Sequence, residues 1–132
     1  MTINVIAILA ATVASYILGS LWYVWLGKSW RSAMGWAETV PLYRPSPVEL
    51  AVGFIAQLVL AIALSGIIFH MGGASLRISL LSAFGIWLGF IMPTLSTNVV
   101  FQRRNFNLIW QDGFHWLVVL LAQGGVMGLL GS

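Results

Sequence analysis

Cysteine is absent from the 132-residue chain, and charged side chains are scarce. The absence of cysteine excludes disulfide bonds, thiolate metal sites and thiol catalysis. Charged residues make up 7% of the chain, whereas a soluble domain carries about 25%. Six basic and three acidic side chains cannot cover a water-facing surface of this size, so lipid must form part of the solvent.

The net charge of +3 does not indicate a nucleic-acid-binding protein. The basic residues lie in polar segments between apolar runs, and they form no stripe that would follow a phosphate backbone. We therefore expect no nucleic-acid partner. The basic residues are better interpreted as signals of membrane topology.

The chain is rich in long apolar runs, and 60% of its residues are hydrophobic. A helix needs roughly 20 apolar residues to cross a hydrocarbon core of about 30 Å. Four stretches meet this requirement, at about 3–26, 48–70, 76–99 and 107–130. They predict an all-α integral membrane protein of one domain, with four transmembrane helices in an up-down antiparallel bundle. The first stretch lacks the basic start of a secretory signal, so we expect it to be retained as a span.

The distribution of basic residues predicts the orientation of the spans. The first loop holds Lys28, Arg31 and Arg44, the third holds Arg103 and Arg104, and the opposite side holds Arg77. Basic loops face the cytoplasm in most membrane proteins. This predicts that the first and third loops are cytoplasmic and that both termini lie on the other side of the membrane.

The first loop, about residues 27–47, is long for a simple connection between two helices. Its sequence predicts a short interfacial helix with Trp30, Ala33, Met34 and Ala37 on one side. Lys28, Trp30 and Arg31 would then anchor the loop at the lipid headgroups. The alternative is a gating or partner-docking segment.

Small residues recur at intervals of four along three of the spans. They are Ala7, Ala11, Ser15 and Gly19 in the first span, Gly85 and Gly89 in the third, and Gly124 and Gly128 in the fourth. Such ladders allow helices to approach closely where apolar burial gives no net driving force. They predict either packing within the bundle or an outward face that builds an oligomer, and the sequence favours neither.

Asp112 and His115 are the ionisable residues that lie inside a predicted span. They are three residues apart and so share one face of the helix. Asn98, Tyr23 and Trp22 are expected at a similar depth. One interpretation is a polar cluster that passes a proton or ion, or binds a small polar ligand. The other is a structural group, in which Asp112 pairs with an arginine and hydrogen bonds hold the helix ends together.

Two tryptophans and two histidines bear on ligand binding. Trp87 lies deep in the third span and Trp116 lies beyond the interfacial belt, so both are candidates for contact with an apolar ligand or a partner helix. His70 and His115 are expected about a membrane's thickness apart, which prevents them from binding one haem or one metal ion within a chain. No metal site is predicted, and the sequence identifies no pigment, haem or quinone. Pro93, in the middle of the third span, predicts a kink.

Several short motifs together resemble the pattern of one family. They are Gly19-Ser20-Leu21-Trp22-Tyr23, Leu26-Gly27-Lys28-Ser29-Trp30, Gly89-Phe90 with Pro93, Asn98 and Phe101, and Asp112-Gly113-Phe114-His115-Trp116. In order and spacing they resemble a bacterial membrane family, domain of unknown function 1761, over nearly the whole chain. Val24-Trp25 stands where that pattern has Ser-Pro. The resemblance implies four spans in a bacterial inner membrane, and it supplies no activity.

Three functions are consistent with these patterns. We favour a non-catalytic accessory subunit that packs against other membrane subunits or a second copy of itself, because the chain has little mass outside the membrane. An oligomeric channel or transporter for a small ion or solute is the alternative, for which Gln57 and Gln123 give a broken polar path. A membrane enzyme acting on lipid or quinone has the least support, because no catalytic constellation stands out.

Overall fold

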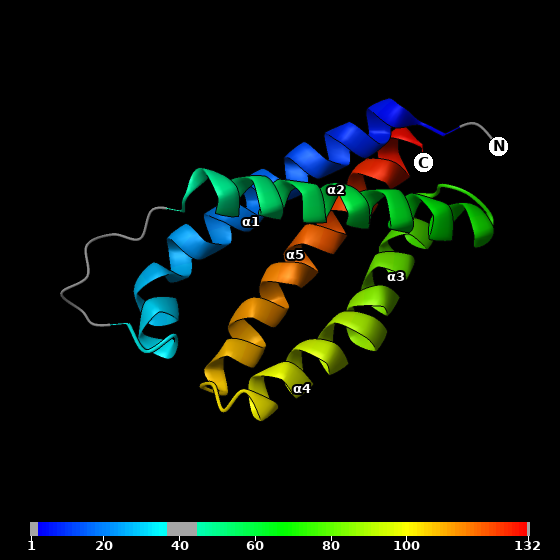
Figure 1. Ribbon diagram of the computed structural model, residues 1–132. Coiled ribbons are helices and arrows are strands. Elements are labelled where there is room, and N and C mark those ends of the chain that lie inside the picture. Colours follow the sequence, from blue (N-terminus) through cyan, green and yellow to red (C-terminus); the bar gives the residue numbers. More distant parts are fainter. Residues whose placement is uncertain (1–2, 37–44, 132) are drawn as a thin grey trace.

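The computed structural model describes residues 3–36 and 45–131, and all regular structure in these ranges is helical (Figure 1). The helices are α1 (Val5–Ala33), α2 (Pro47–His70), α3 (Leu76–Ile86), the π-helical turn η1 (Trp87–Ile91), α4 (Met92–Phe101) and α5 (Asn107–Leu130). Together α3, η1 and α4 make one span, Leu76–Phe101. The four resulting helices are each long and apolar enough to cross a membrane, which confirms the predicted helical membrane fold.

Serine hydroxyls cap the beginnings of two spans. Ser46 Oγ accepts a hydrogen bond from the backbone N–H of Glu49 at 3.2 Å, with Pro47 in the first turn of α2. Ser75 Oγ accepts from the N–H of Ile78 at 3.1 Å at the start of α3. These bonds satisfy amides that have no partner inside the helix.

Helix α1 is longer than the sequence predicts and continues without a break to Ala33. The predicted interfacial helix is therefore wrong for residues 28–33, which are the last turns of α1, and Ala37 lies outside the described residues. The extension has a physical cause, because Ser29 and Trp30 both form hydrogen bonds with α5. These bonds hold the last turns of α1 against the bundle.

Helix α5 is the centre of the fold and lies between α1 and the third span (Figure 1). It runs opposite to α1, since Asn4 Nδ2 donates to Leu130 O at 3.1 Å and Trp22 Nε1 donates to Gln111 O at 2.9 Å. Helix α2 contacts α1, α3 and α5, and it crosses them in Figure 1. The up-down arrangement of the complete bundle stays a prediction.

The small residues divide into an inner and an outer set. The four small residues of α1 are buried, and added Cβ atoms on Gly124 and Gly128 would lie 2.8 and 2.7 Å from backbone atoms of α3. Gly85 and Gly89 are exposed, and a Cβ on either would meet nothing within 4 Å. The chain therefore uses two of its three predicted small-residue ladders internally and leaves the third open.

The third span is interrupted before Pro93. Met92 N–H donates to Trp87 O, five residues back, which is the wider spacing of a π turn. The interruption predicted at Pro93 thus begins one turn earlier, and Pro93 itself lies in the first turn of α4. The π turn includes Trp87, whose Nε1 donates to Gly113 O of α5 at 2.7 Å.

Candidate functional site

Asp112 lies in the second turn of α5 and is bound by two side chains of α1. Its Oδ1 accepts a hydrogen bond from the Tyr23 hydroxyl at 2.6 Å and another from Trp30 Nε1 at 3.0 Å. Tyr23 and Trp30 are seven residues apart, two helical turns, and so share one face of α1. The extended C-terminal part of α1 is what brings both donors to the carboxylate. We call Asp112, Tyr23, Trp30 and His115 the Asp112 cluster.

Both donors to Asp112 are neutral groups. The predicted ion pair between Asp112 and an arginine is not formed in the part of the chain that the structure describes. Arg104 instead donates from Nη2 to the Met34 sulfur at 2.7 Å. The Asp112 side chain is half-buried, and its partners among the described residues are these two hydrogen-bond donors.

His115 lies one turn deeper than Asp112 along α5. Its ring is 4.6 Å from the Tyr23 ring and 4.8 Å from the Trp116 ring, centroid to centroid. The side chain is 7% exposed, and Nδ1 is buried with no hydrogen-bond partner among the described residues. An unpaired buried nitrogen is costly, so this atom is suited to a water molecule or a ligand donor.

Gln111 joins the same polar region and was not among the predicted site residues. Its backbone carbonyl accepts from Trp22 Nε1, and its Nε2 donates to Ser29 Oγ at 3.0 Å. Its Oε1 is buried and has no partner within the described ranges. The signal that could have identified Gln111 is its spacing of four residues from His115, which puts both on one face of α5.

A second polar group lies deeper in the bundle, where α1, α2 and α5 meet. Ser15 Oγ donates to Gln57 Oε1 at 2.7 Å, and Gln123 Nε2 lies 3.1 Å from Ser15 Oγ and 2.9 Å from Gln57 O. We call Ser15, Gln57 and Gln123 the glutamine group. It confirms none of the predicted functions, but it does show that both glutamines bond across helices. Val119, fully buried, lies between His115 and Gln123 on α5.

Other predicted site residues lie elsewhere. Asn98 is exposed and has no side-chain hydrogen bond to the Asp112 cluster. Trp87 is buried against α5, where it stacks on Phe114 with ring centroids 6.0 Å apart. Trp116 is half-buried and packs against the core. The partner helix that Trp87 contacts is therefore a helix of its own chain.

Of the predicted interfacial anchors, Lys28 is exposed and Arg31 half-buried, while Trp30 turns inward to Asp112. His70 is exposed at the end of α2, on the other side of the bundle from His115. Within residues 3–36 and 45–131, no group of three or more histidine and acidic side chains is placed to hold a metal ion.

Chemically, the Asp112 cluster consists of a carboxyl group with two hydrogen-bond donors from α1 and a neighbouring imidazole. The Tyr23 hydroxyl donates a hydrogen bond to Asp112. His115 contacts the Tyr23 ring but forms no hydrogen bond with the Tyr23 hydroxyl. A proton could pass from Asp112 to His115 only through an added group such as water. The arrangement thus suits ion or ligand binding better than direct proton transfer.

A family model described as protein of unknown function (DUF1761) matches residues 6–128. No curated protein matches the chain, and no solved structure does.

Proposed function

The chain belongs to the DUF1761 family of proteins of unknown function, and from this premise we propose that it is a non-catalytic subunit of a larger membrane assembly. Its four apolar spans make it a multi-pass membrane protein. The proposal adds a role in packing beside other transmembrane helices. The observation that carries it is the open pair of glycines, Gly85 and Gly89, on the third span.

The third span is the least buried of the four. Gly85 and Gly89 lie one turn apart on its exposed surface, with the exposed side chains of Leu81 and Leu88 nearby in sequence. In lipid, helices associate by close van der Waals packing, and paired small residues allow that approach. The small residues of α1 and α5 already allow close helix packing inside the chain. The third span therefore has the open face against which another helix can pack.

The interior supports a packing role more than a pore. Fully buried apolar side chains lie along α5 from its middle to its last turn, among them Val119, Leu120 and Met127. A pore through one chain would need polar side chains along the whole depth of a lined cavity.

We further propose a bacterial inner membrane location, with both termini on the non-cytoplasmic side. The end of α1 carries Lys28 and Arg31, and the turn between α4 and α5 carries Arg103 and Arg104, while Arg77 lies at the start of α3. This asymmetry supports the orientation through the preference of basic residues for the cytoplasm.

The test is substitution of leucine for Gly85 and Gly89, followed by native mass spectrometry of the protein extracted gently from its own membrane. Each variant should lose the higher-mass assembly while the single chain unfolds at the wild-type temperature. Gly66→Leu is the matched control, because Gly66 of α2 also has nothing within 4 Å of an added Cβ. Intact assemblies in both third-span variants would refute the proposal.

The composition of the assembly decides between the two candidate functions. Foreign subunits beside the chain support the accessory role. A closed assembly of several identical copies supports the alternative, a channel or transporter for a small ion or solute. That alternative rests on the unpaired polar atoms of Gln111, His115 and Gln123 on α5. Its own test is ion flux into proteoliposomes, which Asp112→Asn should abolish.

A further inference from the structure

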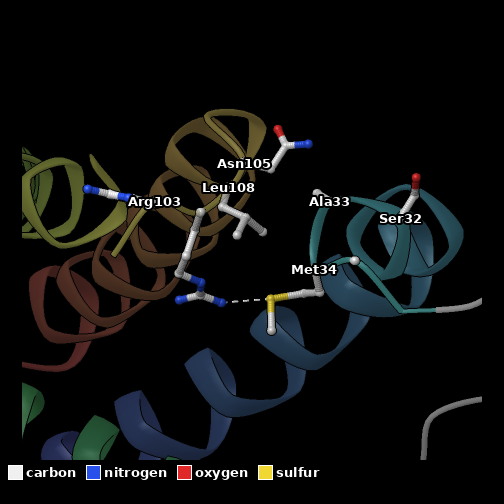
Figure 2. Close-up of a pocket in the computed structure, with 8 residues that line it drawn as sticks. Ser32, Ala33, Met34, Arg103, Asn105 and Leu108 are labelled. Carbon is white, nitrogen blue, oxygen red and sulfur yellow. Dashed lines mark hydrogen bonds between the residues drawn. The ribbon is translucent and has the colours of Figure 1, made fainter. Parts of the chain in front are cut away.

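A groove lies at the basic end of the molecule, apart from the Asp112 cluster. It has a volume of about 380 Å³ and is bounded by the end of α1, with Met34, and by the turn between α4 and α5, with Arg103, Arg104 and Asn105 (Figure 2). Leu108 of α5 forms its floor with the buried Ala33. The groove therefore has an apolar base and a basic rim.

Arg104 on this rim has no acidic partner among the described residues. Arg104 reaches toward α1, and its Nη2 donates to the Met34 sulfur, as the dashed line in Figure 2 shows. A thioether is a weak acceptor, and a guanidinium carries five N–H donors. Asp112 is bound by Tyr23 and Trp30, and no other carboxylate of the described residues bonds with Arg104. Within residues 3–36 and 45–131, the positive charge of Arg104 therefore faces no carboxylate, and it suits an external anion.

The conformation of the neighbouring arginine supports the same conclusion. Arg103 has a φ of 55°, in the left-handed region that favours glycine. Its side chain points away from Met34 on the other side of the turn (Figure 2). A residue held in an unfavourable conformation is a reason to look for a role of its side chain. Here that conformation places the guanidinium groups of Arg103 and Arg104 on opposite sides of the turn between α4 and α5.

The start of α5 adds to the positive potential. It begins at Asn107, three residues after Arg104, and the N-terminus of a helix carries a partial positive charge. The turn also connects two membrane spans, so it lies where lipid headgroups meet water. Basic pockets between spans at this level suit phosphorylated headgroups.

We propose that the groove binds a phosphate group, supplied by the headgroup of an anionic lipid, with Arg104 as the main ligand and Arg103 as a second charge. A guanidinium matches two phosphate oxygens at once, which favours arginine over lysine at this position. The apolar base formed by Leu108 and Ala33 would lie against the first carbons of the lipid. This inference stands apart from the proposed packing function, since it uses the turn between α4 and α5 and neither Gly85 nor Gly89.

The test is native mass spectrometry of the full-length protein with phosphatidic acid or phosphatidylcholine added to the detergent. The wild type should retain phosphatidic acid in preference to phosphatidylcholine. Arg104→Gln should lower the affinity for phosphatidic acid about tenfold, as expected for loss of a charged hydrogen-bonded contact. Arg77→Gln, which removes one positive charge at the other side of the bundle, should leave it unchanged.

Arg104→Lys keeps the positive charge and loses the planar guanidinium group. Its affinity for phosphatidic acid should lie between the affinities of the wild type and of Arg104→Gln. Added inorganic phosphate identifies the source of the anion: failure of millimolar phosphate to displace phosphatidic acid would support the lipid headgroup. Displacement by phosphate would support the same phosphate site with the free ion as its occupant. Equal retention of both lipids by the wild type, or equal losses in Arg104→Gln and Arg77→Gln, would overturn the proposal.

Discussion

Gly19 of α1 lies directly against His115 of α5, and a Cβ added to Gly19 would stand 2.8 Å from His115 Nε2. The imidazole is also in contact with the rings of Tyr23 and Trp116. It therefore has little room in which to move away from a larger residue. The last step of the α1 small-residue ladder thus makes room for the one buried histidine of the described chain.

This contact predicts that Gly19→Ala destabilises the protein through His115. Overpacking of this kind costs about 1–3 kcal/mol. In the His115→Ala background the same substitution should cost less, because the approach of the added Cβ to Val119 Cγ2 at 3.2 Å is then the close contact that remains. Thermal unfolding in detergent micelles would measure the four proteins of this cycle. Gly27→Ala, on the same helix with nothing within 4 Å, is the control, and additive effects of the two substitutions would contradict the prediction.

The spans could be predicted from the sequence because their apolar length is a local property. Depth in the membrane is expected to follow from distance to a span end, and the structure brings Tyr23, Asp112 and His115 into contact, with Trp22 bonded to the neighbouring Gln111. The direction in which a side chain points depends on how helices pack against one another. For that reason Asn98 was expected with the cluster, although the structure leaves it exposed.

The length of α1 could not be predicted from the sequence either, because it also depends on contacts between helices. Its last turns contain charged and polar residues, which look like a separate interfacial segment when only local pattern is considered. They continue α1 because Ser29 and Trp30 bond with residues more than 80 positions away. Long-range contacts of this kind leave no periodic signal in a single sequence.

Two adjacent glycines of α5 give a matched pair of substitutions. A Cβ on Gly124 would lie 2.8 Å from the backbone oxygen of Ser79, whereas a Cβ on Gly125 would meet nothing within 4 Å. Gly124→Ala should force α3 and α5 apart and cost about 1–3 kcal/mol. Gly125→Ala should be neutral or stabilising by up to about 1 kcal/mol. Equal unfolding temperatures for the two variants would show that the α3–α5 contact is looser than the structure indicates.

The glutamine group predicts a measurable contribution from a polar contact deep in the bundle. Gln123→Leu removes the donor shared by Ser15 Oγ and Gln57 O. Hydrogen bonds between membrane helices contribute about 0.6 kcal/mol each on average, so a loss of roughly 1 kcal/mol is expected. Denaturation by increasing SDS would measure it. Met127→Leu, an apolar exchange at another fully buried position of α5, provides the comparison, and a larger loss there would count against the prediction.

The Asp112 cluster predicts different results for asparagine and alanine at position 112. An asparagine side-chain oxygen can still accept from both Tyr23 and Trp30, so Asp112→Asn should unfold within about 1 kcal/mol of the wild type. Asp112→Ala removes the acceptor of the hydrogen bonds from the Tyr23 hydroxyl and from Trp30 Nε1, and the lost bond of the half-buried Tyr23 hydroxyl should cost about 1–3 kcal/mol. Chemical unfolding followed by tryptophan fluorescence would measure both variants.

The reason for this contrast is that both donors are neutral. They require an oxygen that accepts a hydrogen bond, which asparagine also provides. An ion pair would behave differently, since asparagine would remove the charge and leave its partner unpaired. An Asp112→Asn protein as unstable as Asp112→Ala would therefore show that the charge itself holds α1 to α5. Substitution of Phe for Tyr23 in the Asp112→Ala background should restore part of the lost stability, because it removes the hydroxyl donor that Asp112 accepted from. With the fold preserved in Asp112→Asn, any loss of ion flux in that variant would be a loss of chemistry and would favour the channel over the packing subunit.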